Sequence, residues 1–216
     1  ILKIFDYSGS GQVDCFIVTE YVDGVTIQEL VNEHGRLPSE IVSLIGRELA
    51  HALAYAHELG IIHRDLKLEN VMIRRDGTVK LMDFGIARFL DEMNLTLTGA
   101  LVGSPAYMSP EQARSSGSDV DTLSDVYSLG AILYELITWV APFKAATTHD
   151  TLQQVLESKP LSPRVLNSAV PVDLETICLK CLQKERGRRY STAGKLADEL
   201  QRFLDGVPIQ ARPVSR

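Results

Sequence analysis

Apolar positions recur with the period of an α-helix through most of the chain. Between residues 39 and 60 they fall at Ile41, Leu44, Ile45, Leu49, Ala52, Leu53 and Ala56. This spacing predicts a long amphipathic helix. The same period predicts further helices at 124–139, 148–157, 172–183 and 192–204. The body of the molecule is therefore expected to be mostly helical.

Two strand-like patterns are present, one before the long helix at 39–60 and one after it. The runs ILKIFDY at 1–7 and VDCFIVTEY at 13–21 flank a Ser-Gly turn and predict a β-hairpin. A second hairpin is predicted where Asp76-Gly77 joins VMI to TVKLM. Strands and helices together give an α+β fold class.

The segment between the hairpins predicts a short helix. Thr26 and Glu29 have the spacing of a capping box, and Gly35 is expected to end the helix. Residues 22–24, Val-Asp-Gly, are expected to be a linker.

A polar loop, HRDLKLEN at 63–70, separates the long helix from the second hairpin. Asp65 and Asn70 lie on this loop, and Asp83 follows the hairpin, whose two strands would bring both loop ends together. Carboxylate and amide oxygens are ligands that Mg²⁺ shares with substrate phosphates. Lys67 adds a point charge of the kind used against a phosphoryl group. These residues indicate phosphoryl transfer.

Three motifs occur in order along the chain: HRDLKLEN at 63–70, DFG at 83–85 and GSPAYMSPE at 103–111. In this order and spacing they resemble the eukaryotic-like (Hanks-type) protein kinases. Lys67, two residues after Asp65, is similar to the Ser/Thr-specific branch, and GSPAYMSPEQA resembles the bacterial members. The resemblance covers essentially the whole chain. It implies a protein-kinase-like fold, with a mostly helical large lobe and a remnant β-hairpin of the small lobe.

The resemblance also implies a role for each matching residue. Asp65 would accept the proton of the substrate hydroxyl and orient it. Asn70 and Asp83 would hold Mg²⁺ against the phosphates of ATP, and Lys67 would steady the transferring phosphoryl group. The alternative reading of Asp65 and Asn70 is turn formation.

The adenine of ATP would lie against residues that follow the first hairpin. Glu20, Tyr21 and Val22 resemble the hinge, behind the gatekeeper Thr19, and Met72 would form the floor under adenine. Strand-end packing is the alternative, because a hinge acts through backbone groups that any sequence has.

Arg64, next to the proposed catalytic Asp, implies control by phosphorylation. In such kinases this arginine binds a phosphorylated residue of the activation loop, where Thr96 and Thr98 are the candidates. Ser104 stands where the family more often has Thr, and it keeps the hydroxyl.

Other residues match structural positions of the family. Asp125 matches the aspartate of the central helix that holds the backbone of the polar loop, and Glu111 with Arg189 matches a buried ion pair. Three residues are expected in the apolar stack of active kinases: Ile4, His63 and Phe84. In this reading His63 is a core residue and not a catalytic base.

Parts of the family pattern are absent from these 216 residues: the Gly-rich loop, the strand lysine and its helix glutamate. Lys3 imitates the lysine but stands too close to Thr19 to leave room for the intervening helix. We therefore expect a small-lobe remnant at 1–21, a large lobe at 22–205 and a tail at 206–216. A chain of this extent is expected to have little or no kinase activity alone.

Two other functions remain open at this point. A truncated or pseudokinase-like lobe could act as a protein-binding module, since folds outlive functions. A small-molecule phosphotransferase of related fold is the second, against which GSPAYMSPE counts as a protein-substrate loop.

Charge and composition restrict the partners. A formal charge of −6 argues against a nucleic-acid surface. The most apolar stretch, 126–143, contains Glu135 and is read as a buried helix and not a membrane span. No signal peptide is visible. The expected partners are ATP and a protein with Ser or Thr.

The cysteines indicate a reducing setting. Cys15, Cys178 and Cys181 are an odd number without the density of a disulfide framework. Cys178 and Cys181 match C-x-x-C, but without a second pair or a nearby His they are read as core residues. The expected location is the cytoplasm, as a free protein or as the cytoplasmic part of a membrane-anchored kinase.

Overall fold

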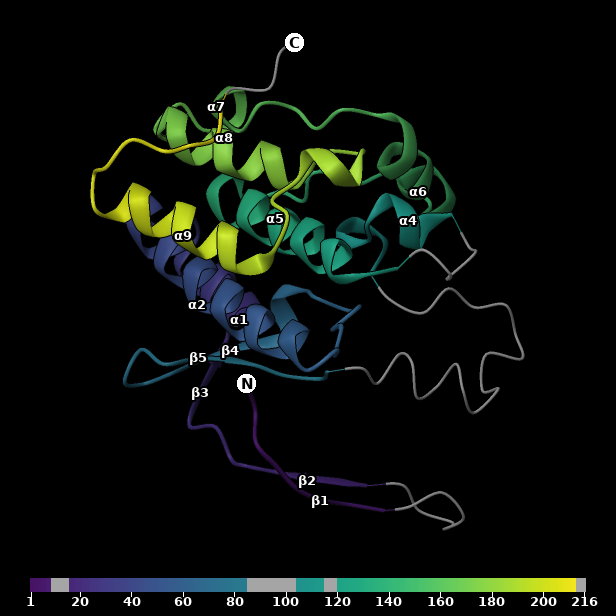
Figure 1. Cartoon of the computed structure of the whole chain (residues 1–216), viewed down its shortest axis with the longest axis vertical. Helices are drawn as coiled ribbons and strands as arrows, with labels where there is room; N and C mark the ends of the chain where they lie inside the picture. The colour runs from purple at the N-terminus through teal and green to yellow at the C-terminus, as the bar shows by residue number, and fades with distance from the viewer. Residues whose placement is uncertain (9–15, 85–103, 115–119, 213–216) are drawn as a thin grey trace.

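The structure is a computed structural model that describes residues 1–8, 16–84, 104–114 and 120–212 (Figure 1). Its strands are β1 (Ile4–Tyr7), β2 (Ile17–Thr19), β3 (Gly24–Thr26), β4 (Val71–Arg74) and β5 (Val79–Leu81). Its helices are α1 (Ile27–His34), α2 (Ser39–Glu58), α4 (Pro110–Ala113), α5 (Thr122–Thr138), α6 (Thr148–Glu157), α7 (Pro163–Leu166), α8 (Val172–Cys181) and α9 (Ala193–Leu204). Short 3-10 turns occupy Leu68–Asn70, Pro105–Tyr107 and Arg186–Arg188.

The five helices predicted from apolar spacing and the one predicted from capping are all present, with small differences at their ends. Helix α2 ends at Glu58 instead of residue 60, because Gly60 adopts a φ of 74° that turns the chain away. The predicted capping box of α1 forms, with Thr26 and Glu29 bonded in both directions. Helices α4 and α7 were not predicted, since four residues are too few to show a period.

Helix α5 lies at the centre of the helical body. Nearly all its side chains are buried, and α2, α8 and α9 pack against it (Figure 1). A helix that is apolar on all sides has to be enclosed, here by other helices. Across the described parts of the chain, no helix combines the length and apolar character needed to cross a membrane.

Gly130 allows α5 and α8 to approach closely. A Cβ at this position would lie 2.4 Å from the Cβ of Cys181. Gly130→Ala is therefore expected to lower the unfolding free energy by about 1–3 kcal/mol, measured by urea unfolding. In the matched variant Gly194→Ala the nearest atom is 3.7 Å away. That change in α9 should be neutral or stabilising by up to about 1 kcal/mol. Equal stabilities of the two variants would contradict the tight contact.

The predicted cysteine pair is part of this core. Cys178 and Cys181 are both fully buried on α8, and burial raises the pKa of the Cys181 thiol to about 12. Among the described residues, no group of three or more His, Cys, Asp or Glu side chains could hold a metal ion. Full burial of both side chains is typical of cysteines that pack as small apolar residues.

A three-stranded antiparallel sheet, ordered β3-β4-β5, covers one end of the helical body (Figure 1). The second hairpin forms as predicted, with Val71 opposite Leu81. The prediction of a linker at residues 22–24 is wrong at Gly24, which belongs to strand β3 and pairs with Arg74. A Cβ on Gly24 would lie 2.1 Å from the carbonyl oxygen of Ile73, so the pairing depends on glycine.

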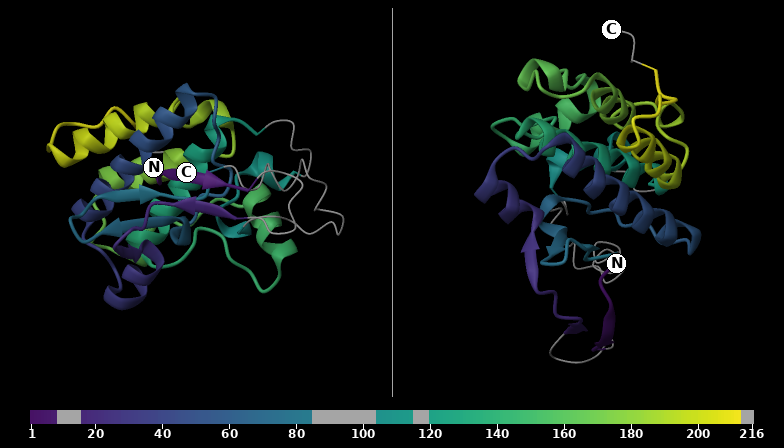
Figure 2. Two further views of the ribbon diagram at one scale, coloured as in Figure 1. Left: turned by 90° about the horizontal axis from the view of Figure 1, so that it is seen from below. Right: turned by 90° about the vertical axis from the view of Figure 1, so that its left-hand side faces the viewer.

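The first hairpin stands apart as a two-stranded sheet of β1 and β2, and Figure 1 and the right view of Figure 2 show it away from the helices. It joins the body through the Leu2 amide, which donates to the Leu81 carbonyl at 2.8 Å. Ile4, expected in an apolar stack, is 57% exposed. No described layer covers this hairpin, which explains the exposure, and such a hairpin is marginally stable by itself.

Candidate active site

In the polar loop, residues 63–70, the residue before Asp65 has a strained backbone conformation. Arg64 has a φ of 68°, in the left-handed region that a side chain disfavours. Asp83, after β5, has a φ of 58°. Strained residues of this kind persist only where surrounding contacts determine the backbone, and they gather at functional sites. The contacts that hold Arg64 therefore indicate how the site is built.

Asp125, in the first turn of α5, holds the start of the polar loop. Its fully buried carboxylate accepts hydrogen bonds from the backbone amides of His63 at 2.8 Å and Arg64 at 2.9 Å. The ring of His57, from α2, contacts the same carboxylate at 2.8 Å. Hydrogen bonds to an ionised group are the strong ones, so this carboxylate fixes the loop to the central helix.

Three predicted catalytic residues lie together on the loop. The Asn70 amide nitrogen donates to the Asp65 carbonyl at 2.8 Å and to its Oδ2 at 3.2 Å. The Lys67 ammonium lies 3.1 Å from Asp65 Oδ2. The side chains of Asp65 and Lys67 are each 24% exposed, so a substrate can reach them. The carboxylate is thus oriented from two sides and still open on a third.

The second hairpin brings Asp83 to this loop. The amide of Met82, its chain neighbour, donates to the Asn70 carbonyl at 2.9 Å. Burial lowers the pKa of His63, while the charges of Asp125, Asp65 and Asp83 oppose this shift. The hydrogen bond from Met82 to Asn70 joins the two loop ends, as the sequence predicts.

His63 is a core residue and its neutral ring is bonded to the backbone on both sides. It is fully buried, Nε2 lies 2.7 Å from the Met82 carbonyl, and Nδ1 accepts the Asp65 amide at 3.3 Å. Its ring packs on Phe84, with 4.7 Å between centroids. Two of the three expected stack members are thus in contact. Both nitrogens are occupied, which leaves none to act as a base.

The donor set fits Mg²⁺. Both hydrogen bonds of the Asn70 side chain use its nitrogen, which leaves Oδ1 available as an oxygen ligand. Asp83, the residue after Met82, would supply a second oxygen. Mg²⁺ is commonly bound through one or two protein oxygens plus substrate phosphates and water. Asn70 and Asp83 could therefore hold this ion together with a nucleotide.

The predicted adenine-binding residues lie at the end of the first hairpin, in the segment that leads to β3, and on β4. Thr19 ends β2, Tyr21 is 90% exposed, and Val22 is buried. Met72 lies half-buried on β4. Glu20 has a further contact that the sequence did not reveal. Its carboxylate accepts from the Lys80 ammonium and from the Lys3 amide, both at 2.9 Å, which lowers its pKa and links the hairpin to β5.

The segment 104–113, after the activation loop, lies against α5. Tyr107 donates from its hydroxyl to Glu135 at 2.7 Å, and its carbonyl accepts from Ser128 at 2.8 Å. Burial raises the pKa of Glu135 in spite of the Tyr107 hydrogen bond, and the charge of Glu69 raises it further. Ser104 begins this segment. Thr96 and Thr98 lie outside the described residues.

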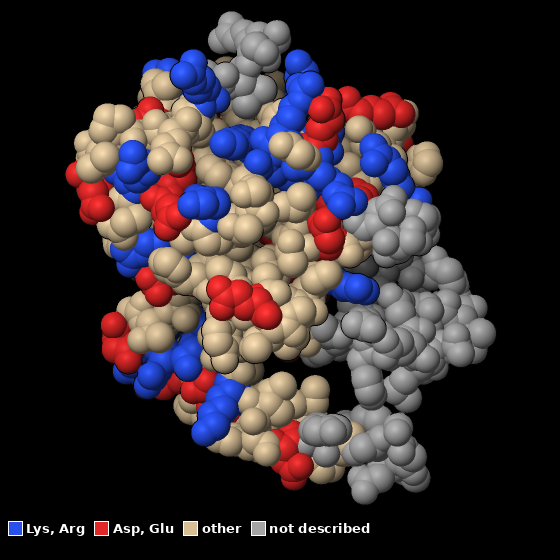
Figure 3. Space-filling model, in the orientation of Figure 1, with Lys and Arg blue, Asp and Glu red and all other residues tan. Residues whose placement is uncertain are grey.

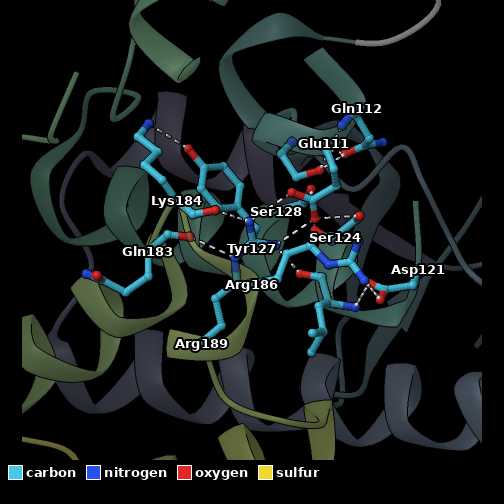
Figure 4. A network of polar contacts seen from close by, with 12 residues as sticks. Glu111, Gln112, Asp121, Ser124, Tyr127, Ser128, Gln183, Lys184, Arg186 and Arg189 are labelled. Carbon is cyan, nitrogen blue, oxygen red and sulfur yellow. Dashed lines mark hydrogen bonds and ion pairs between the residues drawn. The ribbon is translucent and has the colours of Figure 1, made fainter. Parts of the chain in front are cut away.

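Glu111 and Arg189 form the predicted buried ion pair (Figure 4). The guanidinium donates to the two carboxylate oxygens at 2.7 and 2.9 Å, and the Ser124 hydroxyl donates to the same carboxylate at 2.7 Å. Burial alone would raise the pKa of Glu111, but Arg189 and Ser124 together hold it below its usual value. The pair links α4 to the segment between α8 and α9.

Lys and Arg side chains gather over α8 and the following segment on the face shown in Figure 3. The sequence here contains Lys180, Lys184, Arg186, Arg188 and Arg189. Each of the three arginines pairs with a carboxylate, at Asp121, Glu185 and Glu111 respectively. Arg189 is buried, so the charge compensated at the surface is that of Arg186 and Arg188.

Sequence reasoning missed two residues that support the polar loop: His57 contacts Asp125, which holds the loop, and Gln112 bonds to the loop directly. His57 sits on an amphipathic helix, where nothing in the pattern distinguishes it. Gln112 stands three residues after Ser109, which is the spacing of a capping box and was a usable signal.

Known proteins share this sequence and fold. Residues 1–201 match the family model described as the protein kinase domain. The chain belongs to the protein kinase family. The structure also resembles that of Rad53 1–466 in complex with AMP-PNP, with a TM-score of 0.76 and 25% identity over 92% of this chain and 49% of that one. The predicted protein-kinase-like fold is confirmed.

Within the family, the chain groups with the Hanks-type Ser/Thr kinases of bacteria. Serine/threonine-protein kinase PknB of Mycobacterium leprae is 41% identical over 200 residues, which cover 92% of this chain and 32% of that protein. The probable Ser/Thr kinase SCO3848 of Streptomyces coelicolor is 40% identical over 217 residues, or 98% of this chain and 32% of that protein. The chain spans about a third of the length of these relatives.

Proposed function

We propose that the protein to which this chain belongs is a Ser/Thr protein kinase that transfers the γ-phosphoryl group of ATP to protein hydroxyls. One observation carries the proposal: Asp65 is held between Asn70 and Lys67, and the β4–β5 hairpin brings Asp83 to the same loop. The bacterial relatives are named as Ser/Thr kinases, which supports the same activity.

In this proposal, the hydroxyl oxygen of the substrate attacks the γ-phosphorus, and the bond from that phosphorus to the β,γ-bridging oxygen breaks. Asp65 orients the hydroxyl and accepts its proton. The Lys67 ammonium, beside Asp65, balances charge on the transferring group. Asn70 and Asp83 hold Mg²⁺, which when bound neutralises phosphate charge. The leaving group is ADP.

ATP is proposed to enter between the hairpin remnant and the large lobe. The backbone of Glu20, Tyr21 and Val22 would meet adenine beside Thr19, with Met72 beneath it. The proposed division is a small-lobe remnant at 1–21, a large lobe at 22–205 and a tail at 206–216. We propose a cytoplasmic location for this segment, in a free or a membrane-anchored protein, because the proposed reaction uses ATP.

Regulation by phosphorylation is proposed at Thr96 or Thr98. A phosphate there would add a double negative charge that the Arg64 guanidinium can bind. Mapping of phosphate on the autophosphorylated kinase checks this assignment. Phosphate found only at other sites, with full activity in Thr96→Ala, Thr98→Ala, would contradict it.

Phosphoamino-acid analysis tests the main proposal. The kinase as its gene encodes it is incubated with Mg²⁺, labelled ATP and a generic basic protein, and phosphoserine or phosphothreonine is expected. Label confined to small metabolites would instead support a small-molecule phosphotransferase. Absence of label in any acceptor, with partners retained on a column, would support a binding module.

The 216-residue chain alone is proposed to be inactive, because it contains no Gly-rich loop, strand lysine or helix glutamate for the phosphates. The same phosphorylation assay, run on the 216-residue chain, measures its activity. Robust phosphorylation that disappears in Asp65→Asn would overturn this second statement and leave the first intact.

A further inference from the structure

Arg64, the strained residue before Asp65, has both of its backbone polar groups bonded to side chains. Its amide donates to Asp125 at 2.9 Å, and its carbonyl accepts from the Gln112 amide nitrogen at 2.7 Å. The two side chains come from different elements, α5 and α4. The peptide group that leads into Asp65 is therefore held by Gln112, 48 positions further along the chain.

The orientation of the Gln112 side chain follows from its other contacts. Its Oε1 accepts from the backbone amide of Ser109 at 3.0 Å and from the Ser109 hydroxyl at 3.0 Å. A flipped amide would set an NH₂ group against the Ser109 N–H, and an oxygen against the Arg64 carbonyl. Both contacts would then be repulsive, so Nε2 has to face Arg64.

Helix α4 thus connects two parts of the molecule through neighbouring residues. Glu111 points toward Arg189, and Gln112 points away from that pair in Figure 4. On its far side Gln112 reaches the polar loop. A displacement of the segment 104–113 would break the bond to Arg64 while the Asp125 contact remained.

We infer that Gln112 is a positioning residue, which holds Asp65 in place only while the segment 104–113 is folded on the body. The inference rests on the proposed kinase function. In this inference, the position of the proton acceptor Asp65 depends on the folding of the protein-substrate segment 104–113. Loss of the Gln112 donor should misplace Asp65 without changing nucleotide affinity.

The test compares three variants of the whole kinase. Gln112→Glu keeps an oxygen for Ser109 and loses the donor to Arg64. Ser109→Ala loses the capping hydroxyl and keeps that donor. Gln183→Glu is the matched control, since the Gln183 amide also donates to a backbone carbonyl, that of Leu179 at 3.1 Å, away from the loop.

Gln112→Glu is expected to lower kcat about 10- to 100-fold, the range expected for losing a partly buried hydrogen bond and leaving its acceptor unpaired. The KM for ATP should stay within about twofold, and kcat of Gln183→Glu should stay near wild type. Ser109→Ala should lose less kcat than Gln112→Glu, because the Ser109 backbone amide still holds Gln112 Oε1. Equal kcat in Gln112→Glu and Gln183→Glu would overturn the inference. A loss in Ser109→Ala as large as in Gln112→Glu would also overturn it, because capping would then explain the effect.

An NMR measurement separates this inference from the kinase proposal. The Arg64 carbonyl and the Asp65 amide belong to one peptide group, so the Asp65 amide nitrogen should shift in Gln112→Glu and not in Gln183→Glu. A shift in a protein that phosphorylates nothing would support the positioning contact and reject the kinase function. An unshifted Asp65 resonance in an active kinase would reject the positioning contact.

Discussion

Replacement of Asp65 by Asn in the kinase as its gene encodes it is expected to lower kcat about 10²- to 10⁴-fold, the usual contribution of a positioned acid or base. The amide keeps the size of the carboxylate but cannot accept the proton of the substrate hydroxyl. Asp65 binds no residue assigned to adenine, so the KM for ATP should change little. Initial rates of phosphate transfer at saturating ATP measure both constants.

The fold should survive this change. The Asp65 side chain is partly exposed, and the Asn70 amide can still donate to the Asp65 backbone carbonyl. Asp76→Asn is the matched control: it makes the same chemical change in the hairpin turn, where an amide oxygen can still accept from Thr78. A kcat of Asp65→Asn above about a tenth of the control value would show that another group accepts the proton.

The contents of the site were predictable because the sequence places them in short contiguous motifs. Asp65, Lys67 and Asn70 share one loop, and a hairpin of known turn type brings Asp83 back to it. Each of these relations spans few residues, so propensity and turn chemistry determine it. The structure adds the contacts within the loop but does not change which residues lie there.

The supports of the site were harder to predict, because their partners are distant in sequence. His57 meets Asp125 across 68 positions, and Gln112 meets Arg64 across 48. Such pairs depend on how helices pack, which a period of apolar residues does not specify. Strand β3 is not predictable for a similar reason, because Gly24 pairs with the distant Arg74. The strand also has only three residues, too few to show an alternation of apolar and polar positions.

The strain at Arg64 shows why these distant supports matter. A left-handed backbone at a non-glycine residue costs on the order of 1–3 kcal/mol, so a free loop would relax. Two side chains from α4 and α5 hold Arg64 instead. The geometry of the polar loop is thus a property of the packed helices as well as of the motif.

Replacement of Arg189 by Met is expected to lower the unfolding free energy by about 3–5 kcal/mol at neutral pH. The variant leaves the Glu111 carboxylate buried without its cation, and the carbonyls of Leu123 and Gln183 lose a donor. Urea unfolding of the 216-residue chain measures the change. The adjacent Arg188→Met is the control, since its pair with Glu185 is mostly exposed and should contribute about 0–1 kcal/mol.

The pH dependence of this difference identifies its cause. In the wild type the pKa of Glu111 lies below its usual value of 4.5, so its contribution is present above pH 4.5 and is lost as pH falls through the folded pKa. Without Arg189, burial dominates and raises that pKa. Stability of the variant should then decrease as pH rises through 4.5, and the gap to wild type should be widest at neutral pH.

A second substitution separates charge from packing. Glu111→Gln in the Arg189→Met background removes the uncompensated charge and should recover part of the lost stability at neutral pH, because a neutral amide costs less to bury than a carboxylate. Below pH 4.5 the Glu111 carboxyl of the single variant is protonated in both the folded and the unfolded state, so the single and double variants should have similar stability. A gap that is constant with pH would assign the loss to packing of the Arg189 side chain and contradict the role of the ion pair.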